Sequence, residues 1–285
     1  MQITVVSGKG GVGKTMLTSA LAVLFSKEKR IVVCDCDVDC PNLGLMLGAE
    51  YKEKIPLTTS EKAYINNNCN NCGRCVEACI FGAIKKANGK ITINKFLCEG
   101  CGACSFLCKR NAISFKPVQN GKILVGKTSY GFPIVSGSLN IGEAGSGKIV
   151  DSTKQKALEL KEKEKCSLLL NDAAAGISCS VIASIKGSNF VVAVVEPTPA
   201  SFRDLERVLK VVQHFAIPYK IVINKWDLNK ELSEKIESYF RAELLGKIPY
   251  SREIINAIVN LDAKSLAEHK EIIEIYCSIK NLLGI

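Results

Sequence analysis

The most specific chemical signal in the sequence is a glycine-rich segment near its start. Residues 8–15 read Gly-Lys-Gly-Gly-Val-Gly-Lys-Thr, which fits the phosphate-binding pattern G-x-x-x-x-G-K-T. Glycines let successive backbone N–H groups point at phosphate oxygens, a lysine contacts the β- and γ-phosphates, and a threonine hydroxyl binds magnesium. We therefore predict a nucleotide site built by Gly8, Gly10, Gly11, Val12, Gly13, Lys14 and Thr15.

Carboxylates at the ends of two further predicted strands would complete this site. Asp35 and Asp37 follow the apolar run Ile31–Cys34, and Asp172 follows the run Leu168–Leu170. In open α/β sheets, ligands bind at the carboxyl ends of the strands, so these side chains are expected near the phosphate loop and its magnesium. The alternative for these aspartates is a structural role as helix caps.

A fourth segment bears on the choice of base. Residues 224–227 read Asn-Lys-Trp-Asp after another apolar run. The pattern N-K-x-D is how many GTPases recognise guanine, with the aspartate accepting hydrogen bonds from the base. Asp227 therefore leaves GTP as an alternative to ATP.

Eight of the 14 cysteines form a repeated pattern between residues 69 and 108. Each half reads C-x2-C-x2-C-x3-C, and this self-similarity indicates a duplicated unit. The spacing is that of bacterial two-cluster ferredoxins, in which the fourth cysteine of each half binds the cluster of the other half. Zinc ribbons use two cysteine pairs rather than two quartets. We predict one [4Fe–4S] cluster on Cys69, Cys72, Cys75 and Cys108, and a second on Cys98, Cys101, Cys104 and Cys79.

Composition narrows the remaining classes of function. The 285 residues have a formal charge of +10, but the lysines are scattered without an arginine-rich or aromatic-interleaved patch, so no nucleic-acid partner is expected. The two histidines lie in no metal or acid–base motif. No apolar run reaches the length of a membrane span, and the first residues lack the features of a signal peptide. We expect a cytoplasmic protein without a membrane anchor.

The elements that must position these residues follow from short apolar runs. Runs rich in β-branched residues alternate with helical patterns, which predicts an α/β fold with a doubly wound, mostly parallel sheet. The predicted strands are Ile3–Val6, Ile31–Cys34, Leu168–Leu170, Phe190–Val195 and Ile221–Ile223. The predicted helices include Thr15–Lys27, Asp151–Lys165, Ser201–Phe215, Lys230–Leu245 and Glu271–Leu283.

The cysteine-rich segment interrupts this alternation. We predict a small α+β ferredoxin module at residues 66–117, inserted into a P-loop domain made of residues 1–65 and 118–285. A second G-x-x-x-x-G-K sequence spans Gly142–Lys148, but Ile149 replaces the magnesium-binding Ser or Thr. No apolar strand is predicted directly before it, so we interpret it as an ordinary loop.

The form G-K-G-G-x-G-K-T resembles the deviant Walker A motif of the MinD, ParA and nitrogenase iron protein superfamily, and the whole chain resembles members with an inserted ferredoxin domain. The resemblance implies a nucleotide-dependent homodimer in which Lys9 reaches the partner's nucleotide. By the same match, Asp37 would orient the attacking water, Asp35 would hold the magnesium shell, and Asp172 would bind magnesium from the outer shell.

The resemblance also implies Mg-ATP, because this superfamily usually places an Asn near adenine. Asn224, Asp227 and Pro249 are therefore the predicted base contacts. The segment Asn171–Gly176 resembles the family's switch II but lacks its prolines. Cys179 lies at the offset from Asp172 where the nitrogenase iron protein carries a cluster ligand; whether it has that role here is left open.

Three functions are compatible with these motifs. The first is ATP-gated electron transfer to or from an unidentified redox partner. The second is assembly or transport of iron–sulfur or other metal cofactors. Carrier proteins of this superfamily typically present a C-x2-C on the ATPase domain, and the absence of a C-x2-C outside the ferredoxin segment counts against this function. The third is MinD-like positioning with a redox-sensing ferredoxin. This function would use a basic helix that binds a membrane surface, and the polar face of Glu271–Leu283 has too little positive charge for that. We favour the first.

Overall fold

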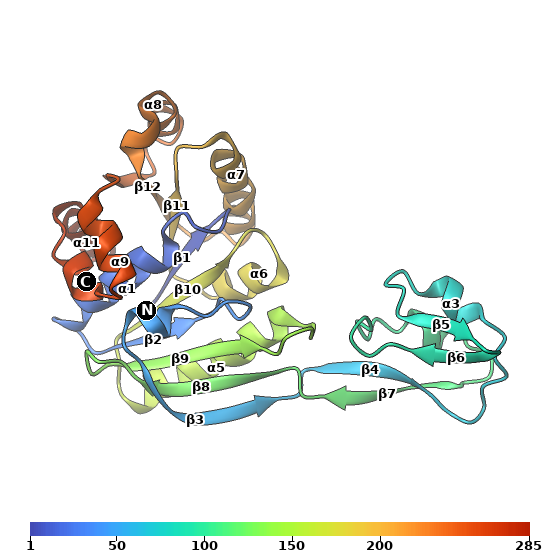
Figure 1. Cartoon of the computed structure of the whole chain (residues 1–285). Coiled ribbons are helices and arrows are strands. Elements are labelled where there is room, and N and C mark those ends of the chain that lie inside the picture. The colour runs from blue at the N-terminus through green and yellow to red at the C-terminus, as the bar shows by residue number, and fades with distance from the viewer. The chain divides into compact units, whose positions relative to one another are not determined.

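The computed structural model describes every residue from Met1 to Ile285, and Figure 1 labels most of its helices and strands. The chain divides into two compact units. The first unit contains residues 1–54, 123–138 and 146–285, and the second contains residues 55–122 and 139–145. The second unit starts before the predicted boundary at residue 66, because residues 60–65 pair with residues 113–118 as one ladder.

A nine-stranded sheet organises the first unit, in the order β13-β12-β11-β1-β10-β2-β9-β8-β3. Every ladder from β13 to β9 is parallel. The strands are β1 (Gln2–Ser7), β2 (Ile31–Asp35), β3 (Glu50–Leu57), β8 (Gly121–Lys127), β9 (Pro133–Leu139), β10 (Leu168–Ala175), β11 (Phe190–Val195), β12 (Tyr219–Asn224) and β13 (Leu244–Ile248). The predicted α/β class with a large, mostly parallel sheet is confirmed.

Helices cover both faces of this sheet, which is why its central strands are almost entirely buried and mainly apolar. One face packs against α1 (Lys14–Ser26), α2 (Leu43–Met46), α9 (Arg252–Val259), α10 (Ala263–Ala267) and α11 (Lys270–Leu283). The other packs against α6 (Cys179–Ile185), α7 (Pro199–His214) and α8 (Lys230–Tyr239), while α5 (Ser146–Lys163) lies against α6 and β2. None of these helices combines the length and the apolar character needed to cross a membrane.

Two expectations about the elements around this sheet were wrong. The predicted helix Lys230–Leu245 ends at Tyr239, and Leu244 starts strand β13, which pairs with β12. A strand does precede the Gly142–Lys148 segment, because β9 runs to Leu139 and α5 starts at Ser146. Serine, glycine and proline within β9 dilute the apolar pattern by which a buried strand is recognised in sequence.

The second unit is small and built from two antiparallel ladders with two short helices. Strand β4 (Ser60–Ile65) pairs with β7 (Ile113–Val118), and β5 (Ile84–Ala87) pairs with β6 (Lys90–Ile93). The helices are α3 (Arg74–Ala78) and α4 (Ala103–Phe106). Its core is compact and apolar, made of Ala63, Ile84, Ile91, Cys104 and Ile113.

Candidate functional site

The glycine-rich loop joins the end of β1 to the start of α1, as its pattern predicts. Gly11 and Gly13 have φ values of +81° and +100°, a left-handed conformation that glycine adopts without strain. Gly8 is required for a different reason. A Cβ atom on it would lie 2.2 Å from the backbone carbonyl carbon of Asp204 in α7, so this loop and that helix pack backbone against backbone.

Two matched substitutions test this packing. Gly8→Ala should lower the free energy of unfolding of the nucleotide-free protein by about 1–3 kcal/mol, because backbone cannot move aside as a flexible side chain does. A Cβ atom at position 10 would have no neighbour within 4 Å, so Gly10→Ala should change the free energy of unfolding by less than about 1 kcal/mol. Chemical denaturation monitored by circular dichroism measures both values. Equal stability of the two variants would contradict the close approach.

A cavity of about 520 Å³ lies over this loop. It is large enough for a small-molecule ligand, and it joins the predicted phosphate loop to the predicted switch residue Asp37. The lining residues are Ser7, Gly10, Gly11, Gly13, Lys14, Thr15, Met16, Asp37, Cys40, Asn42, Leu45, Met46, Ala175, Ile258 and Leu261.

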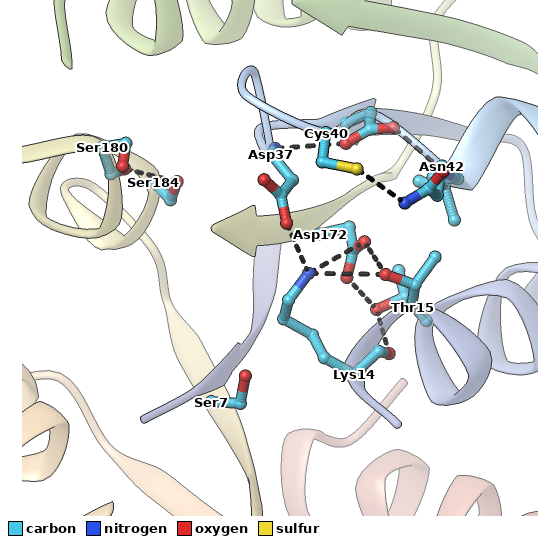
Figure 2. A network of polar contacts seen from close by, with 12 residues as sticks. Ser7, Lys14, Thr15, Asp37, Cys40, Asn42, Asp172, Ser180 and Ser184 are labelled. Atoms are coloured by element: carbon cyan, nitrogen blue, oxygen red, sulfur yellow. Dashed lines mark hydrogen bonds and ion pairs between the residues drawn. The ribbon is translucent and has the colours of Figure 1, made fainter. Parts of the chain in front are cut away.

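Lys14 is the centre of the polar network at this cavity, and Figure 2 shows its side chain pointing toward Asp172 and Asp37. Its Nζ atom lies 3.1 Å from Asp172 Oδ2 and 3.8 Å from Asp37 Oδ2. The Thr15 hydroxyl donates to Asp172 Oδ2 at 2.6 Å, and the Thr18 hydroxyl donates to Asp172 Oδ1 at 2.8 Å. Strand ends and the phosphate loop therefore meet as expected from an open parallel sheet.

Burial and charge act in opposite directions on these groups. Burial acts to lower the pKa of Lys14, but the neighbouring carboxylates of Asp172 and Asp37 raise it above its ordinary value, so the lysine stays positively charged. Burial raises the pKa of Asp37, against the effect of Lys14. The site thus holds a permanent cation where phosphate oxygens are expected.

Asp35 is fully buried, and its carboxylate binds the backbone of its own loop. One oxygen accepts the N–H of Asp37 at 3.1 Å, and the other accepts the N–H of Leu43 at 3.0 Å. Burial and the nearby Asp172 raise the pKa of Asp35 well above its ordinary value. In this conformation Asp35 therefore positions the loop that carries Asp37, and its predicted place in a magnesium shell stays a prediction.

A second cavity, of about 110 Å³, adjoins the phosphate loop at the predicted base contacts. Asn224 lines it and donates from Nδ2 to the carbonyl of Val12 at 2.8 Å. Pro249 and Tyr250 also line it, whereas Asp227 does not. One Asp227 oxygen instead accepts the N–H of Tyr250 at 2.7 Å, so this carboxylate supports the loop of Pro249.

Sequence reasoning missed Glu196, which lies directly after strand β11. Its two oxygens pair with Lys9 at 3.4 Å and Lys225 at 3.2 Å, and Lys225 also donates to the carbonyl of Gly11 at 3.2 Å. The sequence does contain a signal for Glu196, because this carboxylate directly follows the apolar run Phe190–Val195. The same criterion selected Asp35 and Asp172. Lys9 is thus held within its own chain, with its side chain 44% exposed.

The absent prolines of the Asn171–Gly176 segment have a structural consequence. Strand β10 continues to Ala175, which pairs with Ser7, and the N–H of Gly176 donates to the carbonyl of Ser7. Proline has no N–H for such a ladder and would interrupt it. The chain turns at Gly176, where φ is +93°. Cys179 is exposed at the start of α6, a few residues further on.

The eight cysteines of the repeat line two cavities in the second unit. The first has a volume of about 230 Å³ and the second about 20 Å³. Cys69, Cys72, Cys75 and Cys108 line the first cavity, and Cys79, Cys98, Cys101 and Cys104 line the second. Each cavity therefore collects three cysteines from one half of the repeat and one from the other.

No three side chains of His, Cys, Asp or Glu are spaced to hold one metal ion, so the two iron–sulfur clusters stay a prediction from the cysteine spacing. A [4Fe–4S] cubane would present four irons at separate corners, each to one thiolate. Backbone N–H groups also point at the sulfurs: Asn71 donates to Cys69 at 3.4 Å, and Ala112 donates to Cys108 at 3.3 Å.

Comparisons with known proteins match most of the chain, across both units. The family described as the CobQ/CobB/MinD/ParA nucleotide binding domain matches residues 3–262. An uncharacterized protein of Methanocaldococcus jannaschii is 36% identical over 260 residues, covering 91% of this chain and 88% of that protein. A putative septum site-determining protein MinD of Emiliania huxleyi is 23% identical over 264 residues, covering 90% of this chain and 76% of that protein.

Solved structures agree on the fold. The septum site-determining protein MinD of Pyrococcus horikoshii, complexed with Mg-ADP, superposes with a TM-score of 0.60 at 17% identity, covering 99% of this chain and 97% of that one. A chain of the MinC:MinD cell division protein complex of Aquifex aeolicus superposes with a TM-score of 0.59 at 19% identity, covering 100% of this chain and 96% of that one. With the strand–loop–helix geometry of Gly8–Thr15 and a family match over most of its length, the chain belongs to the CobQ/CobB/MinD/ParA nucleotide-binding domain family.

Proposed function

We propose that the chain binds and hydrolyses Mg-ATP as a homodimer and couples its nucleotide state to electron transfer through two [4Fe–4S] clusters. One observation carries this proposal: a single chain combines a charged phosphate-loop site with two cavities that each collect four cysteines. A free ferredoxin needs no nucleotide, so their fusion favours a mechanism in which one controls the other.

ATP is favoured over GTP by the surroundings of Asp227. Guanine recognition by N-K-x-D requires the aspartate to accept hydrogen bonds from the base. Here one carboxylate oxygen already accepts the N–H of Tyr250, and the side chain does not line the base cavity. Asn224 does line it, at the position where the resemblance expects an adenine contact.

The chain's own residues would act on ATP as follows. Lys14 neutralises phosphate oxygens, and the Thr15 hydroxyl and the Asp172 carboxylate hold magnesium when it binds. Asp37 orients the attacking water, and Asp35 holds the backbone from which Asp37 projects. Lys9 exchanges Glu196 for the nucleotide of the partner protomer, which requires the ion pair of 3.4 Å to break when the dimer forms.

The clusters, when bound, supply one-electron chemistry at low potential. Each would be held by three cysteines of one half-repeat and the fourth cysteine of the other, because those are the sets that share a cavity. Nucleotide can shift the redox equilibrium only through its different affinity for the oxidised and reduced protein. The partner that gives or takes the electron is a separate protein.

A redox titration with and without a non-hydrolysable ATP analogue tests this coupling. A coupling free energy of about 1–3 kcal/mol corresponds to a midpoint shift of roughly 40–130 mV for one electron. We expect a shift in this range, absent from the Lys14→Ala variant, which keeps the cysteines but loses the phosphate contact. Identical potentials in the two nucleotide states, together with unchanged electron-transfer rates, would favour the cofactor-assembly function instead.

A further inference from the structure

The two cysteine cavities differ in charge. Arg74, Lys109 and Arg110 line the first cavity and are exposed. No lysine or arginine lines the second cavity, where the one charged residue is Glu99 and the wall is otherwise mainly apolar. We call the three cations of the first cavity the cationic rim.

The cationic rim is not neutralised by other side chains of the unit. The one salt bridge within residues 55–122 and 139–145 joins Lys62 to Glu143. These residues include ten lysines and arginines but only four glutamates and no aspartate. The rim therefore presents a positive charge to solvent beside four cysteines.

Chain connectivity places this charge next to the predicted cluster ligands. Arg74 directly precedes Cys75, and Lys109 and Arg110 directly follow Cys108. A partner that binds the rim therefore lies beside the cluster that these cysteines would hold. Positive charge near a cluster favours its reduced form, which is the more negative one, and N–H donors to sulfur act in the same direction.

We propose that the cationic rim is the docking surface for a small acidic electron-transfer protein that reduces the cluster held by Cys69, Cys72, Cys75 and Cys108. This inference rests on the clusters of the proposed function. One electron passes from the reduced iron–sulfur or flavin centre of the partner to the oxidised cluster; no bond forms or breaks and no proton moves. The same charges make this cluster the easier of the two to reduce.

An acidic protein fits this surface better than a nucleic acid. Binding to a phosphate backbone uses an extended positive stripe, and binding to single strands adds aromatic side chains on which bases stack. The rim has three cations, and no aromatic side chain lines the first cavity. Complementary charge between protein surfaces instead raises the rate of encounter and orients the partner.

The test uses the purified, cluster-loaded full chain and a reduced acidic two-cluster bacterial ferredoxin as the electron donor. The rim variant carries Lys109→Glu and Arg110→Glu. The control carries Lys85→Glu and Lys90→Glu, the same change in charge on the β5–β6 hairpin. Lys85 pairs with Thr92 and Lys90 with Ala87, on the hairpin face opposite to Ile84 and Ile91, which line the cavities. Iron content is measured first in every protein.

Stopped-flow mixing at low salt gives the second-order rate constant for reduction. We expect it to fall by about tenfold in the rim variant and to stay nearly unchanged in the control, with a weaker salt dependence in the rim variant. A redox titration followed by electron paramagnetic resonance should show a lower midpoint potential for one cluster only in the rim variant.

Two outcomes would overturn the proposal. They are an equal loss of rate in both variants and an unchanged rate in the rim variant; in the second case, duplex DNA binding that is weaker in the rim variant than in the wild type would assign the rim to nucleic acid. Failure of the proposed function would look different. Purified wild-type protein without iron would show that the clusters do not exist. Clusters whose midpoint potentials are the same with and without nucleotide would disprove the gating, but the rates of the rim variant and the control could still be compared.

Discussion

Replacing Lys14 by alanine is expected to lower the affinity for ATP by about a hundredfold to a thousandfold, or roughly 3–4 kcal/mol. Lys14 is the buried cation of the phosphate loop, 3.1 Å from Asp172, and its charge is retained because that carboxylate and Asp37 raise its pKa. Without it, phosphate oxygens would enter a cavity that is lined by the carboxylate of Asp37 and by no lysine. Hydrolysis should be lost together with binding.

Fluorescence titration with a labelled ATP analogue measures the affinity. The control is Lys27→Ala, which removes an exposed lysine at the other end of the same helix. Because alanine at position 14 leaves Asp172 buried without its cation, the unfolding transition of each nucleotide-free variant is recorded alongside. Folded Lys14→Ala protein that binds ATP as tightly as the control would remove Lys14 from the phosphate site.

Replacing Cys108 by serine is expected to reduce the iron content from about eight to about four atoms per chain. The lost cluster should be the one that involves Cys69, Cys72 and Cys75, because Cys108 lines their cavity and not that of its sequence neighbours. Serine removes the thiolate ligand while nearly preserving the size of the side chain.

Iron analysis and electron paramagnetic resonance of the reduced protein report the number and type of clusters. Cys277→Ser is the matched control, since Cys277 is exposed and lies in the first unit. Cys104→Ser should remove the opposite cluster and leave the one beside Arg74. If Cys108→Ser instead removes only the cluster of Cys98, Cys101 and Cys104, the cross-ligation is wrong.

The parts of this protein that could be predicted from sequence depend on covalent spacing. A phosphate loop places its N–H groups and its lysine within one turn, so the geometry of the loop can be predicted from the eight residues Gly8–Thr15. The cysteine repeat likewise arranges its ligands through short loops. Buried parallel strands such as Phe190–Val195 are visible because covering both faces requires apolar residues at every position.

Tertiary structure decided what depends on residues far apart in the chain. Glu196 meets Lys9 across 187 positions, and Asp227 meets the backbone of Tyr250 across 23. Strand β13 is recognisable only beside β12, since its residues are all partly exposed except Ile248. Such contacts form when a sheet or a loop brings distant segments together, and no local pattern records them.

The difference in charge between the two cysteine cavities depends on both the sequence and the tertiary structure. The sequence by itself determined that Arg74, Lys109 and Arg110 flank cysteines, and that the chain is basic. Only tertiary structure decided that all three cations line one cavity, because Cys108 crosses from the second half of the repeat to the cavity of the first. The physical reason is that adjacency in a chain specifies neighbours along the backbone, whereas the direction in which a pocket opens depends on how the two halves pack.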